Sequence, residues 1–364
     1  MKKKVGILSM QRVINYGSYL QAYGLKNTIM NMGFDVELVD YHVEGVAPSN
    51  GSIFESIKHY LKMDGKFSHK VGLFLHRRNF PKKYFPLLGI SNYNYNPKLD
   101  YLVIGSDEVF NCFQKAKEVG YSLELFGKDN NADYLLSYAA SFGNTTIEKV
   151  DENKKREELS FYLDKFNAIS VRDLNSESII KELLHKEPSI NIDPVLLYDF
   201  TKDSKFSYER KIKEKYLLLY AYTGRITKSE SDYIKSYAKS KKLKIVCIGG
   251  IEPCGGKFVD CSPYEIFGYF KHAEEIITDT FHGTIFSIIN KNKFHTLVRK
   301  STNGSYGNEE KLSYLLHMFD LDNQLIYSID EINKNTKDID YDHVFELLEK
   351  ERNKSITYLT NNLK

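Results

Sequence analysis

The sequence predicts an α/β protein built from two doubly wound, Rossmann-like domains that face each other across a cleft. Short apolar segments typical of buried parallel strands alternate with helix-like segments along most of the chain. An Asp-Pro turn at residues 193–194 interrupts this series. With 364 residues, 42% hydrophobic and 27% charged, the chain is long enough for two cores. The alternation favours right-handed crossovers and parallel sheets in both halves.

The first domain is predicted over residues 1–193. Ser18 and Gln21 form a Ser-x-x-Gln pattern that predicts a capping box at the start of the first helix, and Gly33 ends that helix. A charged segment and an amphipathic segment predict two later helices. The predicted strands cover residues 5–9, 35–41, 101–106, 134–140 and 168–172, and the helices cover residues 18–33, 151–166 and 176–184.

The second domain is predicted over residues 194–340 and continues the alternation. A helix over residues 229–241 and another after His282 separate its strands. A last helix over residues 341–364 has apolar residues at helical spacing, and we expect it to pack back across the domain junction. The predicted strands cover residues 216–222, 244–249, 275–279 and 294–298.

Composition excludes several classes of function. A net charge of +3 is small for this length and does not indicate nucleic-acid binding. The four cysteines match no common zinc spacing, so we expect reduced thiols. The sequence shows no cluster of metal-ligand residues, so we expect no metal, and we also expect no cofactor. No apolar run reaches the roughly 18–20 residues that span a bilayer, and residues 1–4 lead into a strand, so we expect a cytoplasmic protein. Dinucleotide-binding, Walker and nucleophile-elbow motifs are absent from the sequence.

A basic and aromatic segment over about residues 50–95 is predicted as an insertion in the first domain. Eight Lys and Arg residues between Lys58 and Phe85 are opposed by Asp64 alone. One interpretation is a solvated helix whose aromatic side chains pack on the domain. The other is peripheral contact with the anionic inner membrane surface, where each cation contributes about 1 kcal/mol.

Polar residues follow the predicted strand over residues 275–279 where a helix begins. Open α/β sheets bind anionic ligands at such strand ends, because helix N–H groups converge there. His282 suits general acid–base catalysis, since imidazole titrates near neutral pH; the alternative is a capping or core histidine. Asp279 is a catalytic candidate that either accepts a hydrogen bond from His282 or caps the helix.

Two loops of the first domain carry further candidates. Asn15, Gly17 and Ser18 precede a helix and suit hydrogen bonding to a sugar or an anion, or form a simple N-cap turn. Ser106 and Asp107 follow a strand. Asp107 is a candidate base for an acceptor hydroxyl, or else a helix cap.

Two arginines are candidate anion ligands. Arg172 and Arg299 each stand at the end of a predicted strand. The planar guanidinium binds phosphate or carboxylate through two parallel hydrogen bonds. The alternative for each is a surface arginine, which contributes little.

Six short motifs together resemble those of a known family. The segments over residues 15–23, 103–111, 137–141, 169–172, 193–197 and 279–284 resemble, in this order, motifs of the polysaccharide pyruvyl transferase family. The resemblance covers roughly residues 1–320. It implies a fold similar to the GT-B glycosyltransferases, with the acceptor on the first domain and the donor on the second. It also places Thr280, Gly283 and Thr284 among the substrate-binding candidates.

The resemblance implies transfer of a pyruvyl group from phosphoenolpyruvate to two hydroxyls of a saccharide or lipid-linked saccharide. The product is a pyruvate ketal on a cell-surface polysaccharide or its precursor. His282 would deliver the proton that this reaction needs. Some branches of the family carry an arginine where this chain has Thr280. This difference leaves open a GT-B glycosyltransferase that uses a nucleotide sugar, and a non-catalytic glycan-binding protein is the third alternative.

Overall fold

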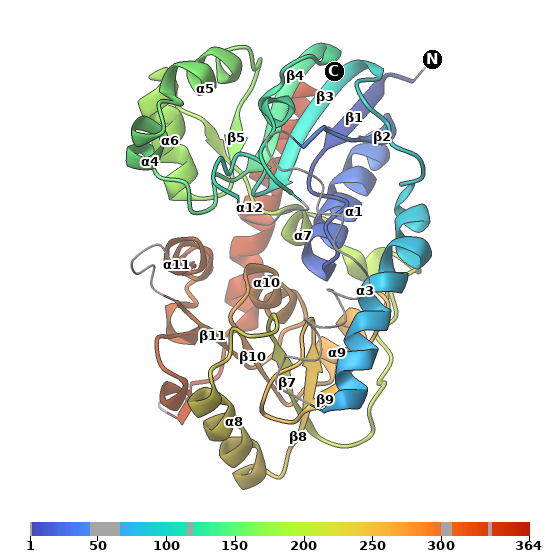
Figure 1. Cartoon of the computed structure of the whole chain (residues 1–364), viewed down its shortest axis with the longest axis vertical. Helices are drawn as coiled ribbons and strands as arrows, with labels where there is room; N and C mark the ends of the chain where they lie inside the picture. Colours follow the sequence, from blue (N-terminus) through green and yellow to red (C-terminus); the bar gives the residue numbers. More distant parts are fainter. Residues whose placement is uncertain (1, 44–65, 115–118, 300–307, 334–336) are drawn as a thin grey trace. The chain divides into compact units, whose positions relative to one another are not determined.

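The computed structural model describes residues 2–43, 66–114, 119–299, 308–333 and 337–364. It divides into two compact units, each with its own sheet (Figure 1). Unit 1 comprises Met1–Pro48, Phe85–Asp199 and Phe345–Lys364, and unit 2 comprises Ser49–Tyr84 and Phe200–Val344. The chain therefore changes unit after Asp199, beyond the boundary predicted at residue 193. The reason is local packing, because a Cβ on Gly24 in the first helix would lie 2.7 Å from the carbonyl oxygen of Pro194.

Unit 1 contains a parallel sheet whose strands follow the order β2-β1-β3-β4-β5-β6. The central strands are buried on both faces, as Val103, Ile104 and Leu136 are fully inaccessible to solvent. The strand order reverses between β1 and β3, so the topological switch point lies there, and ligands of open α/β sheets bind at such points. The strands are β1 (Lys4–Leu8), β2 (Asp35–Val39), β3 (Lys98–Asp107), β4 (Asn131–Ala140), β5 (Ser170–Val171) and β6 (Ser189–Ile190).

The first helix of unit 1, α1 (Tyr16–Asn31), begins earlier than predicted. Its N-cap is Asn15, whose Oδ1 accepts a hydrogen bond from the Ser18 amide at 2.6 Å. The side chain of Gln21 donates to Ser9 Oγ and to the Ser18 carbonyl. The predicted capping box of Ser18 and Gln21 is therefore wrong, because Asn15 is the residue with extended backbone at the helix start.

The predicted helix over residues 151–166 is two helices, α4 (Ile147–Glu152) and α5 (Arg156–Leu163). Thr146 caps α4 by accepting a hydrogen bond from the Lys149 amide. Lys154 then adopts a left-handed conformation with φ of 54°, which no α-helix continues through. The other helices of unit 1 are α6 (Leu174–Leu184), α7 (Pro194–Leu197) and the 3₁₀ helix η1 (Leu123–Phe126).

The last helix, α12 (Tyr341–Asn362), packs into unit 1 from Phe345 onward. Leu348 and Leu359 are fully buried. Ser355 Oγ accepts hydrogen bonds from the Asn191 side chain and the Ile192 amide, both at 3.2 Å. This helix thus completes the core of unit 1, although it lies at the far end of the sequence.

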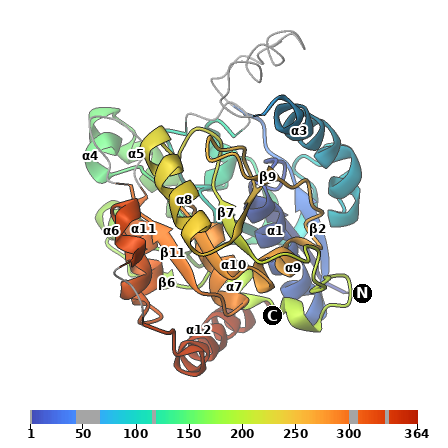
Figure 2. The same ribbon diagram turned by 90° about the horizontal axis from the view of Figure 1, so that it is seen from below.

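Unit 2 contains a second parallel sheet with the order β12-β11-β10-β7-β8-β9. Counted along the chain, this is the Rossmann order, and the switch point lies between β7 and β10. Figure 2 labels β7, β9 and β11 of this sheet. The strands are β7 (Tyr216–Tyr220), β8 (Lys244–Ile248), β9 (Lys257–Phe258), β10 (Glu275–Thr278), β11 (Phe294–Leu297) and β12 (Leu325–Ile326).

The two faces of this sheet have different cores. On one face, Leu217 and Leu219 pack with Ile234 of α8 (Lys228–Ser240). On the other, the ring of Tyr220 packs edge to face against rings from α9 (Ile266–Lys271) and α10 (Phe281–Ile289). The remaining helices of unit 2 are α11 (Glu309–His317) and the 3₁₀ helices η2 (Phe200–Lys202), η3 (Asp322–Gln324) and η4 (Ile329–Asn333).

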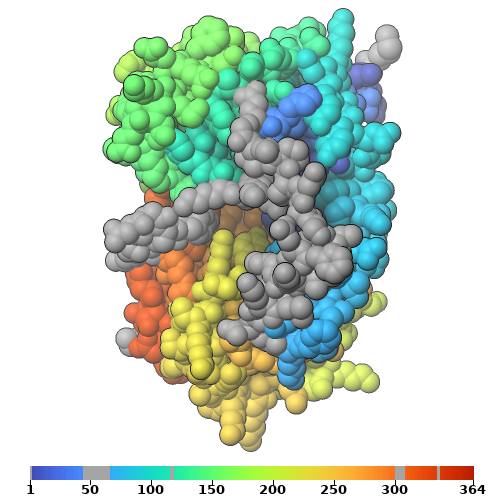
Figure 3. Space-filling model, viewed as in Figure 1, coloured from blue at the N-terminus to red at the C-terminus, as the bar shows by residue number. Residues whose placement is uncertain are grey.

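The described part of the basic segment forms α3 (Phe67–Leu88), which carries no acidic residue. One face is buried through Leu73 and Phe80, while His76 Nδ1 lies 2.6 Å from Asp260 Oδ1. The opposite face exposes apolar side chains, and α3 reaches the surface of the molecule in Figure 3. Residues 50–65 of the predicted insertion lie outside the described residues. None of the helices in the described ranges has the length and hydropathy that crossing a membrane requires.

Leu359→Ala is expected to lower the free energy of unfolding by about 2–5 kcal/mol, because a cavity replaces a fully buried side chain. Ile356→Ala on the same helix is the matched control, since Ile356 is 38% exposed, and we expect a change of roughly 0.5 kcal/mol. Urea unfolding followed by circular dichroism measures both. Equal losses would contradict the role of α12 in the core of unit 1.

Candidate functional site

Several predicted residues of unit 1 meet at the switch point between β1 and β3. Ser18 Oγ donates a hydrogen bond to Asp107 Oδ2 at 2.7 Å, and Asn15 Nδ2 donates to Ser18 Oγ at 3.1 Å. Arg172 Nη2 lies 3.5 Å from Asp107 Oδ1. Asp107 has φ of 73°, which is uncommon for a residue with a side chain and recurs at functional sites. The carboxylate of Asp107 is thus held in one orientation from two sides.

Arg172 is buried in an ion pair and does not lie on the surface. Its Nη1 is 2.8 Å from Asp193 Oδ2, and these two side chains are 2% and 0% exposed. Ser106 Oγ donates to the Ala139 carbonyl and lies 3.5 Å from the same Asp193 oxygen. The described contacts of Arg172 therefore orient Asp107 and Asp193, and direct binding of substrate by Arg172 stays a prediction.

Gly17 is buried in the first turn of α1, where it contributes backbone alone. Asn15, Ser18, Ser106, Asp107 and Arg172 are joined by the hydrogen bonds and ion pairs of one network.

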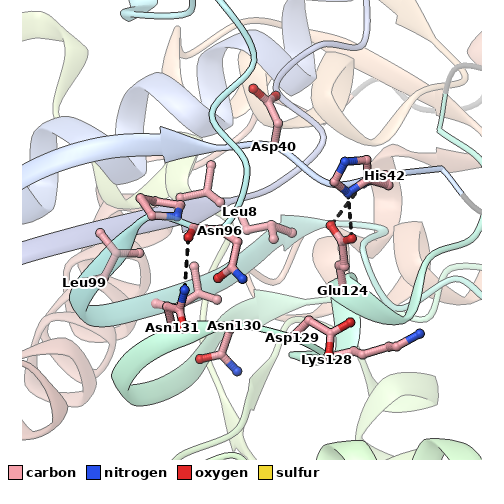
Figure 4. Close-up of a pocket in the computed structure, with 13 residues that line it drawn as sticks. Leu8, Asp40, His42, Asn96, Leu99, Glu124, Lys128, Asp129, Asn130 and Asn131 are labelled. Atoms are coloured by element: carbon pink, nitrogen blue, oxygen red, sulfur yellow. Dashed lines mark hydrogen bonds and ion pairs between the residues drawn. The ribbon is translucent and has the colours of Figure 1, made fainter.

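A pocket of about 240 Å³ also lies in unit 1 (Figure 4). Apolar side chains of the sheet, including Leu8 and Leu99, line part of it, and carboxylates and carboxamides line the remainder. His42 Nδ1 lies 2.8 Å from Glu124 Oε1 at its rim, and Asp40 is held by Arg12 through two contacts of 2.5 and 2.7 Å. Sequence reasoning missed this pocket because its residues come from strands and loops that are separate in the sequence.

In unit 2, the Thr280 side chain caps α10. Its Oγ1 accepts a hydrogen bond from the Gly283 amide at 2.9 Å. A Cβ on Gly283 would clash with Thr278 Oγ1 and lie 2.7 Å from the Tyr220 ring, so glycine is required there by packing. Thr284 is fully buried, and its Oγ1 lies 3.0 Å from Thr296 Oγ1. These residues shape the start of α10, and substrate contact by their side chains stays a prediction.

His282 lies in the first turn of α10 and is 7% exposed. Its ring is 5.6 Å from the Phe281 ring and 6.1 Å from the Phe286 ring, measured between centroids. The surrounding aromatic rings hold the imidazole at the carboxyl end of β10, beside the switch point.

Asp279 neither accepts a hydrogen bond from His282 nor caps α10, the two roles predicted for it. Thr280 is the cap, and neither carboxylate oxygen of Asp279 is in hydrogen-bonding geometry with any residue that the structure describes, His282 included. The side chain is fully buried and lies 3.9 Å from Arg225 Nη1. Burial raises the pKa of Asp279 to about 6, although the charges of Arg225 and Arg299 oppose this shift. A catalytic role for Asp279 remains a prediction, but it would not act through a hydrogen bond with His282.

Arg299 is engaged with a carboxylate at this edge of the sheet. Its Nη1 and Nη2 bind Glu230 at 2.6 and 3.0 Å, and Nη2 also donates to the Arg225 carbonyl at 3.0 Å. Burial opposes ionisation of Glu230, but hydrogen bonds from Arg299 and Thr227 lower its pKa below the ordinary value. Arg299 thus lies near the switch point, where Glu230 fixes the orientation of its guanidinium.

Sequence reasoning missed Arg225 and Glu252. Glu252 follows β8 and is 3% exposed, and neither of its oxygens is in hydrogen-bonding geometry with a described donor. Burial, and then the negative charge of Asp279, raises the pKa of Glu252 to about 9. Gly250 in the sequence could have indicated this loop, because glycine permits close approach of two backbones. A Cβ on Gly250 would lie 2.5 Å from the Thr223 amide nitrogen, so the loop of Glu252 packs closely on the loop after β7.

The cysteines and the potential metal ligands of the described residues form no further candidate site. The four cysteines are free and buried. Within the described ranges, no group of three or more His, Cys, Asp or Glu side chains is placed to hold a metal ion. The absence of a metal and of a cofactor stays a prediction.

Comparison with known proteins decides the family. The family model described as polysaccharide pyruvyl transferase matches residues 15–301. The chain belongs to this family. The pyruvyl transferase match runs from the first candidate residue, Asn15, to beyond the last, Arg299, and confirms the resemblance stated above. The protein is an enzyme, a transferase. No curated protein matches this chain in sequence.

A solved structure confirms the predicted fold class. The glycotransferase of kitacinnamycin aligns over 100% of both chains with a TM-score of 0.50 and 8% identity. The UDP-GlcNAc 2-epimerase from Neisseria meningitidis bound to UDP-GlcNAc covers 100% of this chain and 99% of its own, with a TM-score of 0.49 and 10% identity. At these identities the likeness concerns the fold alone.

Arg172→Met is expected to lower the free energy of unfolding by about 3–5 kcal/mol, because it removes the cation that pairs with the buried Asp193 carboxylate. Arg156→Met is the matched control, since the Arg156–Asp151 pair is exposed and we expect a loss of about 0–1 kcal/mol. Chemical unfolding measures both. A small effect of Arg172→Met would show that Arg172 is not the structural partner of Asp193.

Proposed function

We propose that this transferase moves a pyruvyl group from phosphoenolpyruvate to two hydroxyls of a surface polysaccharide or its precursor, forming a pyruvate ketal. The observation that carries the proposal is the family match over residues 15–301, within which polar and charged candidates follow the strands at the switch point of each sheet. Open α/β sheets bind their ligands at these points.

The donor is assigned to unit 2. Arg225 and Arg299 supply positive charge near the carboxyl ends of β7 and β11 for the phosphate and carboxylate of phosphoenolpyruvate. His282 supplies a proton to the methylene carbon of the enol, so that a C–H bond forms and the adjacent carbon becomes electrophilic. The first acceptor oxygen bonds to that carbon, and the second then bonds there as the C–O bond to phosphate breaks. The leaving phosphate takes up the proton that the second hydroxyl loses.

The acceptor is assigned to unit 1. Asp107 receives the proton of the attacking hydroxyl, and Ser18 with Arg172 keeps its carboxylate oriented for this task. Asn15 and Ser18 carry polar groups that suit a saccharide. The pocket bounded by Asp40 and Glu124 is smaller than the roughly 300–1,000 Å³ of pockets for drug-sized ligands, so it suits a group of monosaccharide size.

The second candidate function is transfer of a glycosyl group from a nucleotide sugar. Thr280 favours it, because some branches of the family have an arginine at this position. The hydroxyl of Thr280 is already used as a helix cap and adds no positive charge for phosphoenolpyruvate.

Calorimetric titration of the protein with phosphoenolpyruvate and with a panel of nucleotide sugars separates the two functions. We expect phosphoenolpyruvate to bind, and His282→Asn to retain this binding while turnover falls about 100-fold or more, because a proton donor is lost but the charges remain. Phe281→Leu is the control for packing at the same turn. Binding of a nucleotide sugar alone would establish the second function, and binding of neither would support a non-catalytic protein.

We also propose that α3 contacts an anionic membrane surface, as a lipid-linked acceptor would require. Phe67, Val71 and Leu75 are 67%, 40% and 42% exposed and recur every four residues along one face of the helix. The basic residues of the same helix are Lys70, Arg77, Arg78, Lys82 and Lys83, and each such cation near the surface contributes about 1 kcal/mol.

Cosedimentation with vesicles tests this contact. The full chain is expected to bind vesicles of phosphatidylglycerol and phosphatidylcholine but not of phosphatidylcholine alone. Replacing Phe67, Val71 and Leu75 together by Ser should weaken binding about tenfold or more, because the apolar contacts are lost. Phe161→Ser removes a comparably exposed ring elsewhere, on α5, and should have no effect. Equal binding to both vesicle types would refute the contact.

A further inference from the structure

Glu252 is the most anomalous ionisable residue that the proposed chemistry does not use. It lies in the loop between β8 and β9, at the carboxyl edge of the sheet of unit 2. The side chain is buried, and no described donor is in hydrogen-bonding geometry with either oxygen. The Ile226 amide and the charge of Arg299 favour its ionised form, but burial outweighs both. A carboxylate in such a place costs several kcal/mol, whereas a neutral carboxylic acid costs much less.

The charges around Glu252 also favour the neutral acid. Asp279, Cys254 and Glu230 face it, and a negative charge on any of them opposes its ionisation. The two arginines nearby are committed to other carboxylates, since Arg299 binds Glu230 and Arg225 lies 3.9 Å from Asp279. Among the described residues, neither guanidinium donates a hydrogen bond to Glu252, although the charge of Arg299 acts on it.

We propose that Glu252 is a neutral carboxylic acid that donates a hydrogen bond to an anionic phosphoryl oxygen of the donor substrate bound in unit 2. A protonated carboxyl has one O–H donor, and a buried acid kept neutral at pH 7 is a known way to stabilise an oxyanion. Glu252 follows β8, the neighbour of β7, and its charge interacts with Asp279, which follows β10. It therefore lies near the switch point between β7 and β10, where an open sheet receives its ligand. Arg225 and Arg299 supply the positive charge, and Glu252 supplies a directed donor that adds no negative charge.

This inference rests on the assignment of the donor to unit 2, but it does not depend on which donor is used. Phosphoenolpyruvate and nucleotide sugars share the anionic phosphoryl oxygen. Inorganic phosphate is therefore the probe, with phosphoenolpyruvate and UDP as the two comparison ligands.

Two substitutions separate donation from packing. Glu252→Gln keeps the length, the neutrality and an N–H donor, whereas Glu252→Met keeps the length but removes the donor. At pH 7, we expect Glu252→Gln to bind phosphate within about threefold of the unsubstituted protein, and Glu252→Met to bind about 10–100-fold more weakly, as for loss of a hydrogen bond to a charged group. Calorimetric titration measures both.

The pH dependence supplies a second readout. The pKa of Glu252 is about 9, so the acid ionises as the pH rises from 7 to 9.5, loses its donor and repels the phosphate. The ratio of the dissociation constants of the unsubstituted protein and Glu252→Gln should therefore rise about threefold or more, while the titration of phosphate cancels in this ratio. Both proteins should carry Cys254→Ser, because the pKa of Cys254 is about 7 and its charge faces Glu252.

Stability without ligand checks the neutral state independently. The pKa in the folded protein lies above the ordinary value of 4.5, so folding binds this proton. The stabilisation is fully present below pH 4.5 and is lost as the pH rises toward 9. The melting temperature of Glu252→Gln should thus exceed that of the unsubstituted protein by an amount that grows from pH 5 to pH 9.

The outcomes distinguish this inference from the proposed function. Equal phosphate affinity of Glu252→Gln and Glu252→Met, or a ratio that does not change with pH, would overturn the donor role. If the variants behave as expected but UDP binds and phosphoenolpyruvate does not, the proposed pyruvyl transfer fails and the role of Glu252 stands. If phosphoenolpyruvate binds equally to the unsubstituted protein, Glu252→Gln and Glu252→Met, the donor role of Glu252 fails and the proposed pyruvyl transfer stands.

Discussion

Parallel pairing of the strands is the constraint that places every candidate residue of this protein. In a parallel sheet all carboxyl ends lie at one edge, so the loops that follow the strands meet there. In unit 2, β7 and β10 are neighbours although two strands and two helices separate them in the sequence. Arg225 and Asp279 approach to 3.9 Å for this reason. In unit 1 the pairing of β1 with β3 brings Ser18 to Asp107.

The buried charged residues at the two candidate sites differ in how they are paired. In unit 1, Arg172 lies against Asp193 and Asp107, so each buried charge has a partner and the geometry of Asp107 is fixed. In unit 2, Glu252 and Asp279 are buried without hydrogen-bond donors among the described residues, and both have raised pKa values. Buried acids with raised pKa values recur at functional sites, because the same environment that disfavours the charge tunes the group for donation or proton transfer.

Much of the fold could be predicted from local pattern. Apolar runs predicted the long strands, and the junction of β10 with α10 was predicted as the place of His282, since burial and helix propensity are properties of neighbouring residues. Prediction from local sequence pattern failed at two helix boundaries, where tertiary contacts or backbone conformation overrode the pattern. Gln21 suggested a capping box but bonds to Ser9, and Lys154 interrupts a segment whose composition is uniformly helical.

The sequence by itself determined the α/β class, the ordered motifs of the pyruvyl transferase family and the residue types available for acid–base chemistry. The tertiary structure alone decided which of these side chains meet. Arg299 binds Glu230 and Arg172 binds Asp193 across long stretches of chain, and Glu252 lost its access to water through the packing of loops that are distant in sequence. Charge pairing and burial depend on spatial neighbours, and strand order, which sets those neighbours, is not encoded in any single segment.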